Sequence, residues 1–363
     1  MRIIHCADLH LDSKMESNLN KEQAKIRRLE LLDTFERMVD WAEANAVNAI
    51  LVAGDMFDKG HIRKEAKKKV LTAIKEHPQI GFYYIRGNHD KSDFIEEGVD
   101  DVPSNLFMFS AESWNSYELE NVVITGVELL SSNSGTIADR LVLDRAKTNI
   151  VMLHGQESNY DSKADAEIIN INSFKDKGID YMALGHIHSY SLKTLDDRGV
   201  YCYSGCLEGR GFDETGDKGF VLLEILDGKI DTEFISFSAR RLHEIVVEVD
   251  KDMDMMSVVS AVKNAVDEHD VDKQDLIKIV ITGERDLDDD IDVNRIIRTF
   301  AENYFFVKCY DRTRTYIDYD SFLHDKTLKG EFVRLVQKQE LSDDDKAAII
   351  EMGIKAIMGE ELD

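Results

Sequence analysis

The chain has 363 residues, of which 43% are hydrophobic and 32% charged, as expected of a globular protein and not of a disordered one. Its 71 Asp and Glu residues against 45 Lys and Arg give a net charge of -26, which opposes non-specific attachment to nucleic acid or to an anionic membrane. Four cysteines without a Cys-x-x-Cys pair argue against a metal site built on sulfur, and no apolar stretch is long enough for a signal peptide or a membrane span. We therefore expect a cytoplasmic protein whose contacts with DNA, if it makes them, are local or arranged by a partner.

The N-terminal part alternates short apolar runs with helical patterns. Each run is short and apolar enough to be a strand buried on both faces, while the segments between the runs repeat apolar residues at helical spacing. Pro78 ends the second helical pattern. This order predicts a β-α-β-α-β unit with parallel strands and right-handed crossovers. The strands are predicted at residues 3–7, 50–53 and 80–85, and the helices at residues 21–45 and 62–74.

From residue 106 onward the predicted strands follow one another closely. Two segments alternate around the turn signals Asp197-Arg198-Gly199 and Asp227-Gly228 and are typical of hairpins. An irregular stretch and then a helical pattern near Phe174 separate two of the strands. We predict a first domain, residues 1–240, that is a four-layer αββα sandwich of two mixed sheets. Its further strands are predicted at residues 106–109, 117–119, 122–130, 149–153 and 181–184, and its hairpins at residues 189–204 and 218–237.

The rest of the chain predicts two smaller parts. Residues 241–319 are predicted to form a small α/β domain of order β-α-β-α-β, with Asp254 as a helix cap. This domain has no candidate catalytic or metal-binding residues of its own. Residues 320–363 form a tail with two helical patterns, the last opened by Ser342. The apolar face of that last helix needs a partner, either the body of this chain or another protein. That face consists of Ile350, Ile354, Ile357 and Met358.

Polar residues follow five of the apolar runs directly. A lone Gly-Asp, such as Gly216-Asp217, is usually a turn, but the same change from an apolar run to possible ligands recurs five times here. Five of the 11 histidines stand at these strand ends, whereas His5, inside the first strand, is expected to be a core residue. Ligands bind at the carboxyl ends of strands in open α/β sheets, so these residues predict a site. The five blocks are Asp8-Leu9-His10, Gly54-Asp55, Gly87-Asn88-His89-Asp90, His154-Gly155 and Gly185-His186-Ile187-His188.

The ligand types in these blocks point to a pair of metal ions. Imidazole, carboxylate and amide ligands without thiolate suit Mn, Fe or Zn. Two such ions about 3.5 to 4 Å apart need a ligand that bridges them, for which we choose Asp55. Two divalent ions, two carboxylates and a bridging hydroxide leave a net positive charge facing a phosphate. The predicted ligands are Asp8, His10, Asp55 and His188 for one ion and Asp55, Asn88, His154 and His186 for the other.

Other polar residues near the same edge are candidates for direct roles in catalysis. His89 is expected to contact the substrate phosphate or to protonate the leaving oxygen, with Asp90 as the candidate that orients its ring. Asp90 could instead simply cap a loop. Asp58, Asp12 and His61 lie near the same edge, and from the residues alone each is best interpreted as a solvated loop residue.

The five blocks, in this order and with this spacing, resemble those of the calcineurin-like metallophosphoesterases. Residues 4–12, residues 203–213 and the sequence Lys218-Gly219-Phe220 further look like the SbcD-type DNA repair exonucleases. This narrower resemblance covers about residues 1 to 245.

The resemblance implies an αββα sandwich with a di-manganese site and nuclease activity on DNA phosphodiesters. It also implies a capping domain that helps to place DNA and a coiled-coil ATPase of the SbcC type bound through the helices that follow. Asp58 and Arg210 would contact the substrate, although some family members carry His at the position of Asp58. A homodimer is left open.

Three functions compete on these grounds. The first is a metal-dependent DNA exonuclease subunit that acts with an ATPase, and the second is a phosphoesterase for small nucleotides or other soluble phosphoesters. The third is a scaffold for a partner ATPase with a weak metal site. The complete ligand set argues against this third reading.

Overall fold

The computed structural model describes residues 1–15, 19–58, 62–90, 94–95, 101–130, 132–159, 167–287 and 290–358. The chain divides into two compact units, Met1–Arg241 and Leu242–Asp363, and each is considered by itself. The predicted division into three parts, with a nuclease, a capping and a partner-binding role, stays a prediction. His61 lies outside the described residues.

The first sheet of the first unit contains the predicted β-α-β-α-β unit. Strands β1 to β4 are parallel, and a hairpin extends the sheet beyond β1 in antiparallel fashion. The strand order is β14-β13-β1-β2-β3-β4. The elements are β1 Arg2–Cys6, α1 Lys21–Ala44, β2 Ala49–Ala53, α2 Lys64–Glu76, β3 Gly81–Ile85, β4 Leu106–Met108, β13 Gly219–Leu226 and β14 Lys229–Ser236.

The second sheet has parallel strands in its centre and antiparallel strands at both edges. Its order is β11-β12-β10-β7-β6-β5, and β8 and β9 form a separate two-stranded ribbon. The helical pattern near Phe174 is a single 3-10 turn, Ile171–Phe174. The strands are β5 Asn115–Leu119, β6 Val122–Gly126, β7 Thr148–His154, β8 Gln156–Ser158, β9 Ile168–Asn170, β10 Tyr181–Gly185, β11 Ser191–Thr194 and β12 Val200–Tyr203.

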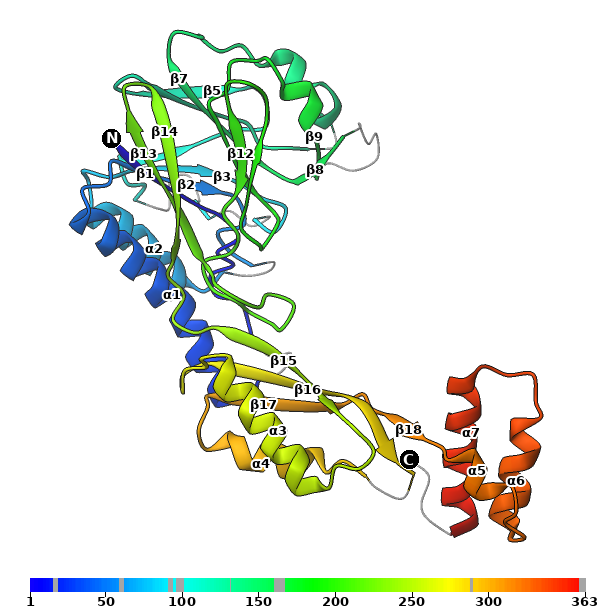
Figure 1. The fold of residues 1–363 in the computed structure, drawn as a ribbon. Coiled ribbons are helices and arrows are strands. Elements are labelled where there is room, and N and C mark those ends of the chain that lie inside the picture. Colours follow the sequence, from blue (N-terminus) through cyan, green and yellow to red (C-terminus); the bar gives the residue numbers. More distant parts are fainter. Residues whose placement is uncertain are drawn as a thin grey trace. The chain divides into compact units, whose positions relative to one another are not determined.

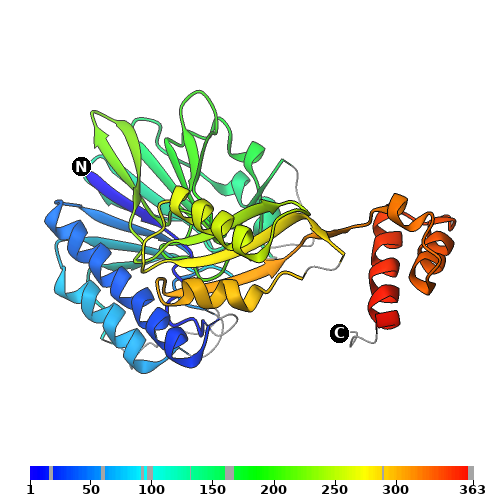
Figure 2. The same ribbon diagram turned by 60° about the horizontal axis from the view of Figure 1, so that its bottom comes forward.

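The two sheets pack face to face, with further layers outside, as Figures 1 and 2 show for the first unit. Side chains such as Leu51 of β2 and Ile150 of β7 fill the space between the sheets. Phe35 and Met38 of α1 pack on the outer face of the first sheet. In the described part of the chain, the outer face of the second sheet is covered by 3-10 turns, around Ile137. The predicted sandwich of two mixed sheets is therefore confirmed, with an outer layer of 3-10 turns over its second sheet.

Local sequence explains where α1 begins. The side chain of Asn20 accepts a hydrogen bond from the backbone N–H of Gln23, and the Gln23 side chain accepts one from the N–H of Asn20. This capping box satisfies two N–H groups that an isolated helix end would leave without partners. The helix can therefore start directly after the loop that carries the first block of predicted ligands.

The second unit contains a small parallel sheet and three tail helices. Its strands β15, β16 and β17 are parallel, and Asp254 accepts from the N–H of Ser257 at the start of α3, as predicted. No helix in the described residues is both long and apolar enough to cross a bilayer. The elements are β15 Leu242–Val249, α3 Met255–Glu268, β16 Leu276–Asp286, α4 Val293–Ala301, β17 Phe306–Asp311, β18 Arg314–Tyr316, α5 Tyr319–Phe322, α6 Leu328–Gln337 and α7 Asp343–Met358.

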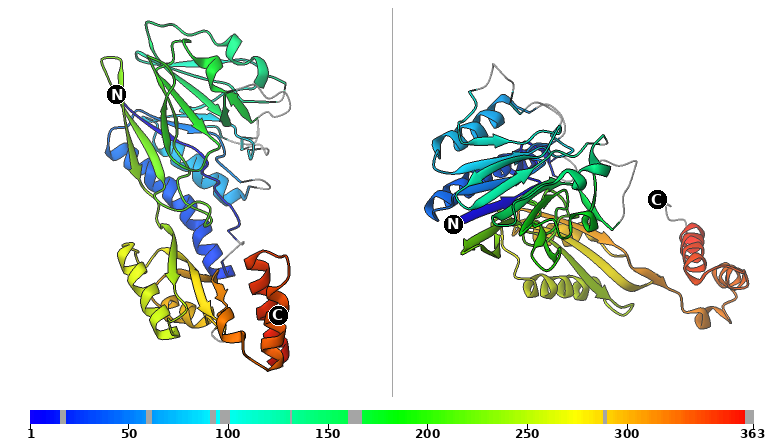
Figure 3. Two further views of the ribbon diagram at one scale, coloured as in Figure 1. Left: turned by 45° about the vertical axis from the view of Figure 1, so that its right-hand side comes forward. Right: turned by 90° about the horizontal axis from the view of Figure 1, so that it is seen from above.

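The last two helices, α6 and α7, lie side by side (Figure 3). Ser342 accepts from the N–H of Asp345, which is the predicted start of α7. Ile350 and Ile354 are buried with Val333 of α6 in one small apolar cluster. The chain itself thus covers part of the predicted apolar face of α7, while Ile357 on that face stays exposed. The side chain of Met358 lies outside the described residues.

Candidate metal centre

The loops after β1, β2, β7 and β10 are joined to one another by backbone hydrogen bonds. The N–H of Asp8 donates to the carbonyl of Gly54, and the N–H of His10 donates to the carbonyl of Asp55. The two sheets are connected at this edge because the N–H of His186 donates to the Asp8 carboxylate at 2.9 Å. Polar groups that are far apart in the sequence therefore converge on one edge of the sandwich.

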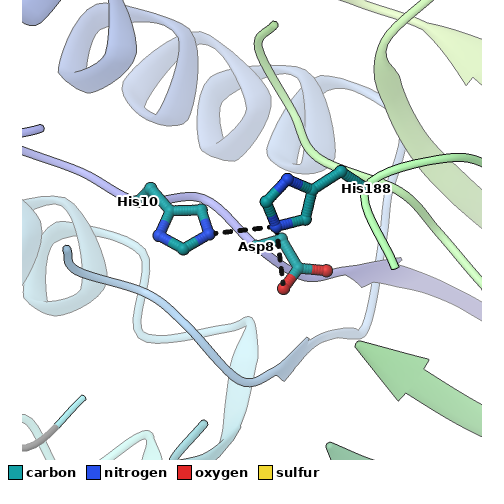
Figure 4. A group of neighbouring side chains, drawn as sticks. All are labelled: Asp8, His10 and His188. Atoms are coloured by element: carbon teal, nitrogen blue, oxygen red, sulfur yellow. Dashed lines mark hydrogen bonds and ion pairs between the residues drawn. The ribbon is translucent and has the colours of Figure 1, made fainter. Parts of the chain in front are cut away.

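Asp8, His10 and His188 form one cluster of ligand-type atoms (Figure 4). The Nε2 atoms of His10 and His188 are 3.2 Å apart, and Nε2 of His188 lies 3.9 Å from Oδ1 of Asp8. Oδ2 of Asp55 lies 3.8 Å from Nε2 of His10. These four side chains are the predicted ligand set of the first ion.

A second cluster forms on the other side of Asp55. Oδ2 of Asp55 lies 3.5 Å from Nε2 of His154, and Oδ1 of Asn88 lies 3.1 Å from the same nitrogen. The ring of His186 stands edge-on to that of His154, with centroids 5.5 Å apart. The structure thus brings together the predicted ligands of the second ion, with the Asp55 carboxylate between the two sets.

The backbone at this edge is held in unusual conformations. Four of the seven predicted ligands have positive φ angles, in a region that residues other than glycine seldom occupy. Such strain persists only where the surrounding structure enforces it, and it concentrates at functional sites. The four are Asp8 at 51°, His10 at 43°, Asp55 at 52° and His186 at 99°.

Glycines of the five blocks leave room for the ligands. A Cβ atom at Gly87 would lie 2.2 Å from Oδ1 of Asp55, and one at Gly54 would lie 2.1 Å from Nδ1 of His154. Both contacts are too short for a real side chain, and Gly54 also has a φ of +95°. The glycines are therefore needed so that the carboxylate and the imidazole can occupy these positions.

Burial controls the protonation of the first cluster. It raises the pKa of Asp8 to about 6, against the opposing influence of the His154 and His188 imidazoles. Burial also lowers the pKa of His10 to about 3, and the charge of Arg210 adds to that effect. A divalent cation would compensate the Asp8 charge and accept the lone pair of a neutral His10.

The second cluster contains a charged pair. Burial alone would lower the pKa of His154, but the hydrogen bond with Asp55 raises it to about 9. Burial alone would raise the pKa of Asp55, yet His154 and His10 hold that pKa well below its usual range. Asp55 is thus ionised, as a bridging ligand must be. The donor set fits two divalent ions that share this carboxylate.

The structure differs from the expectation for Asp90 and Asp58. Oδ1 of Asp58 lies 3.0 Å from Nδ1 of His89, so Asp58 has the place next to the ring that we expected for Asp90. Asp90 is buried and accepts from the backbone N–H groups of Phe57 at 3.0 Å and Gly87 at 3.0 Å. It acts as a cap for two loops, because those buried N–H groups need acceptors.

Arg210 and Asp12 are both paired with residues of the chain. The Nη2 atom of Arg210 donates to Oε1 of Glu214 at 3.1 Å, and Asp12 accepts from the backbone N–H of Arg63 at 3.0 Å. Nε of Arg210 is buried, with no hydrogen-bond partner among the described residues. A contact of Arg210 or Asp58 with substrate stays a prediction.

Sequence reasoning missed Glu214, whose Oε1 atom lies 2.6 Å from Nδ1 of His188. No local pattern marks this residue, because it stands in an acidic turn region and 26 positions after its partner. The family-like stretch of residues 203–213 ends just before it. His5 is buried and bonded to the hydroxyl of Tyr181 at 2.8 Å, as a core histidine should be.

The chain is similar in sequence to a known family and to several known proteins. The sequence profile described as calcineurin-like phosphoesterase matches residues 1–190. The chain is 28% identical over 260 residues to the uncharacterised metallophosphoesterase YhaO of Bacillus subtilis, covering 68% of this chain and 62% of that protein. The chain therefore spans less than two thirds of the length of that relative.

A second relative is matched over most of its length. The chain is 26% identical over 324 residues to the DNA double-strand break repair protein Mre11 of Sulfolobus acidocaldarius, covering 85% of this chain and 82% of that protein. The crystal structure of a dimetal phosphatase from Danio rerio superimposes with a TM-score of 0.39 at 11% identity, over 66% of this chain and 99% of that chain.

Proposed function

The chain belongs to the calcineurin-like phosphoesterase family, and we propose that it is a DNA exonuclease subunit that works with two Mn ions. The observation that carries this proposal is the position of the Asp55 carboxylate. Its Oδ2 atom lies 3.8 Å from Nε2 of His10 and 3.5 Å from Nε2 of His154, so one oxygen faces both ligand sets. A carboxylate in that position is what a pair of ions requires.

DNA as the substrate rests on the relatives and on local sequence. The relative from Sulfolobus acidocaldarius is described as a DNA double-strand break repair protein, and the alignment covers 82% of it. Residues 4–12 and 203–213 resemble the SbcD-type DNA repair exonucleases. We expect this activity in the cytoplasm.

The chain's own residues would divide the work as follows. When bound, the ions polarise the phosphate and lower the pKa of a water molecule. The proposed ligands would hold the ions, and Asp55 would belong to both ligand sets. Asp58 accepts a hydrogen bond from Nδ1 of His89, and its carboxylate would balance the charge of the doubly protonated ring, which can then donate the Nε2 proton to the leaving oxygen.

A second function is favoured by the charge of the chain. A net charge of -26 repels a DNA polyanion, whereas a small phosphoester needs no extended basic surface. A phosphoesterase for small nucleotides would use the same metal centre. A DNA nuclease of this composition would depend on a partner for DNA affinity.

One experiment separates these functions. The purified chain with Mn is incubated with an end-labelled linear duplex and, separately, with bis-p-nitrophenyl phosphate. Shortening of the duplex supports the exonuclease, and cleavage of only the small ester supports the alternative. Asp55→Ala should abolish both activities by releasing the ions. If this variant keeps full activity, both enzymatic proposals are wrong.

His89→Ala should abolish cleavage while Mn stays bound. The matched control is His243→Ala, because His243 in the second unit also pairs with a carboxylate at 3.0 Å, that of Asp275. In the small-ester assay this control should be unaffected.

We further propose that a coiled-coil ATPase of the SbcC type binds the tail. Deletion of residues 342–363 should abolish ATPase binding and leave the metal content unchanged. Unchanged ATPase binding would refute this role of the tail.

A further inference from the structure

Two residues of the segment 205–218 contact the main-chain carbonyl of His188. The His188 carbonyl accepts from Nζ of Lys218 at 3.0 Å and from the N–H of Cys206 at 3.4 Å. Lys218 and Cys206 are both buried. A buried lysine that donates to a carbonyl is rare, since an ammonium group is expensive to desolvate, so this contact fixes the His188 backbone firmly.

The same segment also holds the His188 ring. Oε1 of Glu214 lies 2.6 Å from Nδ1 of His188, a distance typical of a charge-assisted hydrogen bond. The other oxygen of Glu214 accepts from the backbone N–H of Arg210 at 2.7 Å. Nη2 of Arg210 donates to Oε1 as well, at 3.1 Å. These hydrogen bonds therefore fix the Glu214 carboxylate in the position from which it contacts His188.

This hydrogen bond determines which nitrogen of the His188 ring can bind a metal ion. An ionised carboxylate only accepts, so Nδ1 of His188 carries the proton and Nε2 offers its lone pair. Nε2 is the atom that lies 3.2 Å from His10 and 3.9 Å from Asp8. A carboxylate that is hydrogen-bonded to a ligand histidine also makes the ring a stronger electron-pair donor to the metal ion.

His188 is supported differently from His154 and His10. Nδ1 of His154 lies 2.9 Å from a neutral acceptor, the carbonyl of Ala53. Nδ1 of His10 is buried without a hydrogen-bond partner among the described residues, and Oδ1 of Asp58 lies 3.8 Å from it, beyond hydrogen-bond reach. The first ion therefore depends on Glu214 more than the second ion does.

The segment is in turn anchored to helix α1. Glu208 is buried and accepts from Oγ1 of Thr34 at 2.7 Å and from Nη2 of Arg27 at 3.1 Å. This anchor keeps the segment against the sandwich without touching His188. It gives residues 205–218 a fixed frame in which Glu214 can position the imidazole.

We propose that Glu214 is a positioning residue that sets the affinity of the first metal ion through His188. Residues 205–218 are then a part of the metal centre, although they lie beyond the residues 1–190 that match the family profile. The inference rests on the proposed two-ion site. It concerns ion binding and holds for either substrate class.

The test measures Mn binding to the full chain by isothermal titration calorimetry. Glu214→Gln should weaken one of the two ions about 10- to 100-fold and leave the other unchanged. The matched control is Glu128→Gln, because Glu128 and Glu214 are both 5% exposed and Glu128 pairs with Arg86 instead of a ligand histidine. The control should bind both ions like the wild type.

A double-mutant cycle then identifies the route of the effect. In a His188→Ala background, Glu214→Gln should weaken Mn no further, because its effect passes through the missing ring. An equal additional loss in that background, or unchanged binding in the single variant, overturns the inference. If Glu214→Gln does not fold, Glu214→Asp withdraws the carboxylate but keeps the charge, and the same selective loss is expected.

The wild-type titration separates this inference from the proposed function. If the wild type binds no pair of ions, the proposed metal centre itself fails. If the wild type binds two ions and Glu214→Gln does so equally well, only the role of Glu214 is refuted.

Discussion

Asp58 accepts a hydrogen bond from Nδ1 of His89 at 3.0 Å and thereby fixes which nitrogen of that ring faces away from the carboxylate. This pair joins the loop after β2 to the loop after β3, and these loops also carry the predicted ligands Asp55 and Asn88. In the proposed reaction, this contact would hold the His89 ring in a fixed orientation toward the leaving oxygen.

Loss of the carboxylate charge beside His89 should slow the chemical step. We expect Asp58→Asn to lower kcat about 10- to 100-fold, which is part of the rate enhancement that general acid catalysis supplies. Mn binding should be unchanged. The readout is kcat for bis-p-nitrophenyl phosphate beside Mn stoichiometry. Asp12→Asn is the control, since Asp12 pairs with Arg63. An unaltered kcat in Asp58→Asn would show that the pair has no catalytic part.

A methyl group at Gly87 should displace the bridging carboxylate. The added Cβ would lie 2.2 Å from Oδ1 of Asp55, so Gly87→Ala should lose both ions in a Mn titration. Gly135→Ala is the control, because its Cβ would meet nothing within 4 Å. Gly87→Ala with two tightly bound ions would mean that Asp55 is not the bridge.

The buried ion network on α1 should make stability depend on pH. Burial alone would raise the pKa of Glu30, but hydrogen bonds from Arg240 and Arg27 lower it from 4.5. A lowered carboxyl pKa contributes stability that is complete above about 4.5 and is lost as the pH falls through the folded-state value. Glu30→Gln should thus reduce the free energy of unfolding by about 1 to 3 kcal/mol at pH 7.

That difference should shrink as the pH falls below about 4.5, where the unfolded chain takes up the proton first, and should vanish below the lowered folded-state pKa of Glu30, where the folded wild-type carboxyl is protonated as well. Urea unfolding of both proteins at a series of pH values measures it. A difference that stays constant down to acid pH would contradict the ion-pair origin.

Exposed leucines on α6 should matter for the ATPase and not for folding. Leu328 and Leu335 are 68% and 54% exposed, in contrast to the buried Val333. We expect Leu328→Glu with Leu335→Glu to weaken binding of the SbcC-type ATPase at least about tenfold, the loss of about 1.4 kcal/mol. The melting temperature should stay that of the wild type. Equal ATPase binding by the double variant and the wild type would show that these leucines are not part of the binding surface.

Much of the fold follows from local sequence. Strands such as β2 are apolar on both faces and stop at a glycine followed by a ligand-type residue, so their burial and the site at their ends are both encoded within about ten residues. The cap residues Asn20 and Asp254 likewise act on N–H groups three positions away. Patterns of this length can be read without the tertiary structure.

The sequence by itself therefore determined the sandwich and the set of residues that converge at its edge. Only the tertiary structure decided that Asp58 and not Asp90 contacts His89, and that Glu214 stands behind His188. Asp58 and Glu214 each contact a histidine that lies on a different loop of the folded chain. Asp90 found backbone N–H groups that burial would otherwise leave without acceptors. Such choices depend on distances between segments far apart in the chain, and local spacing does not specify them.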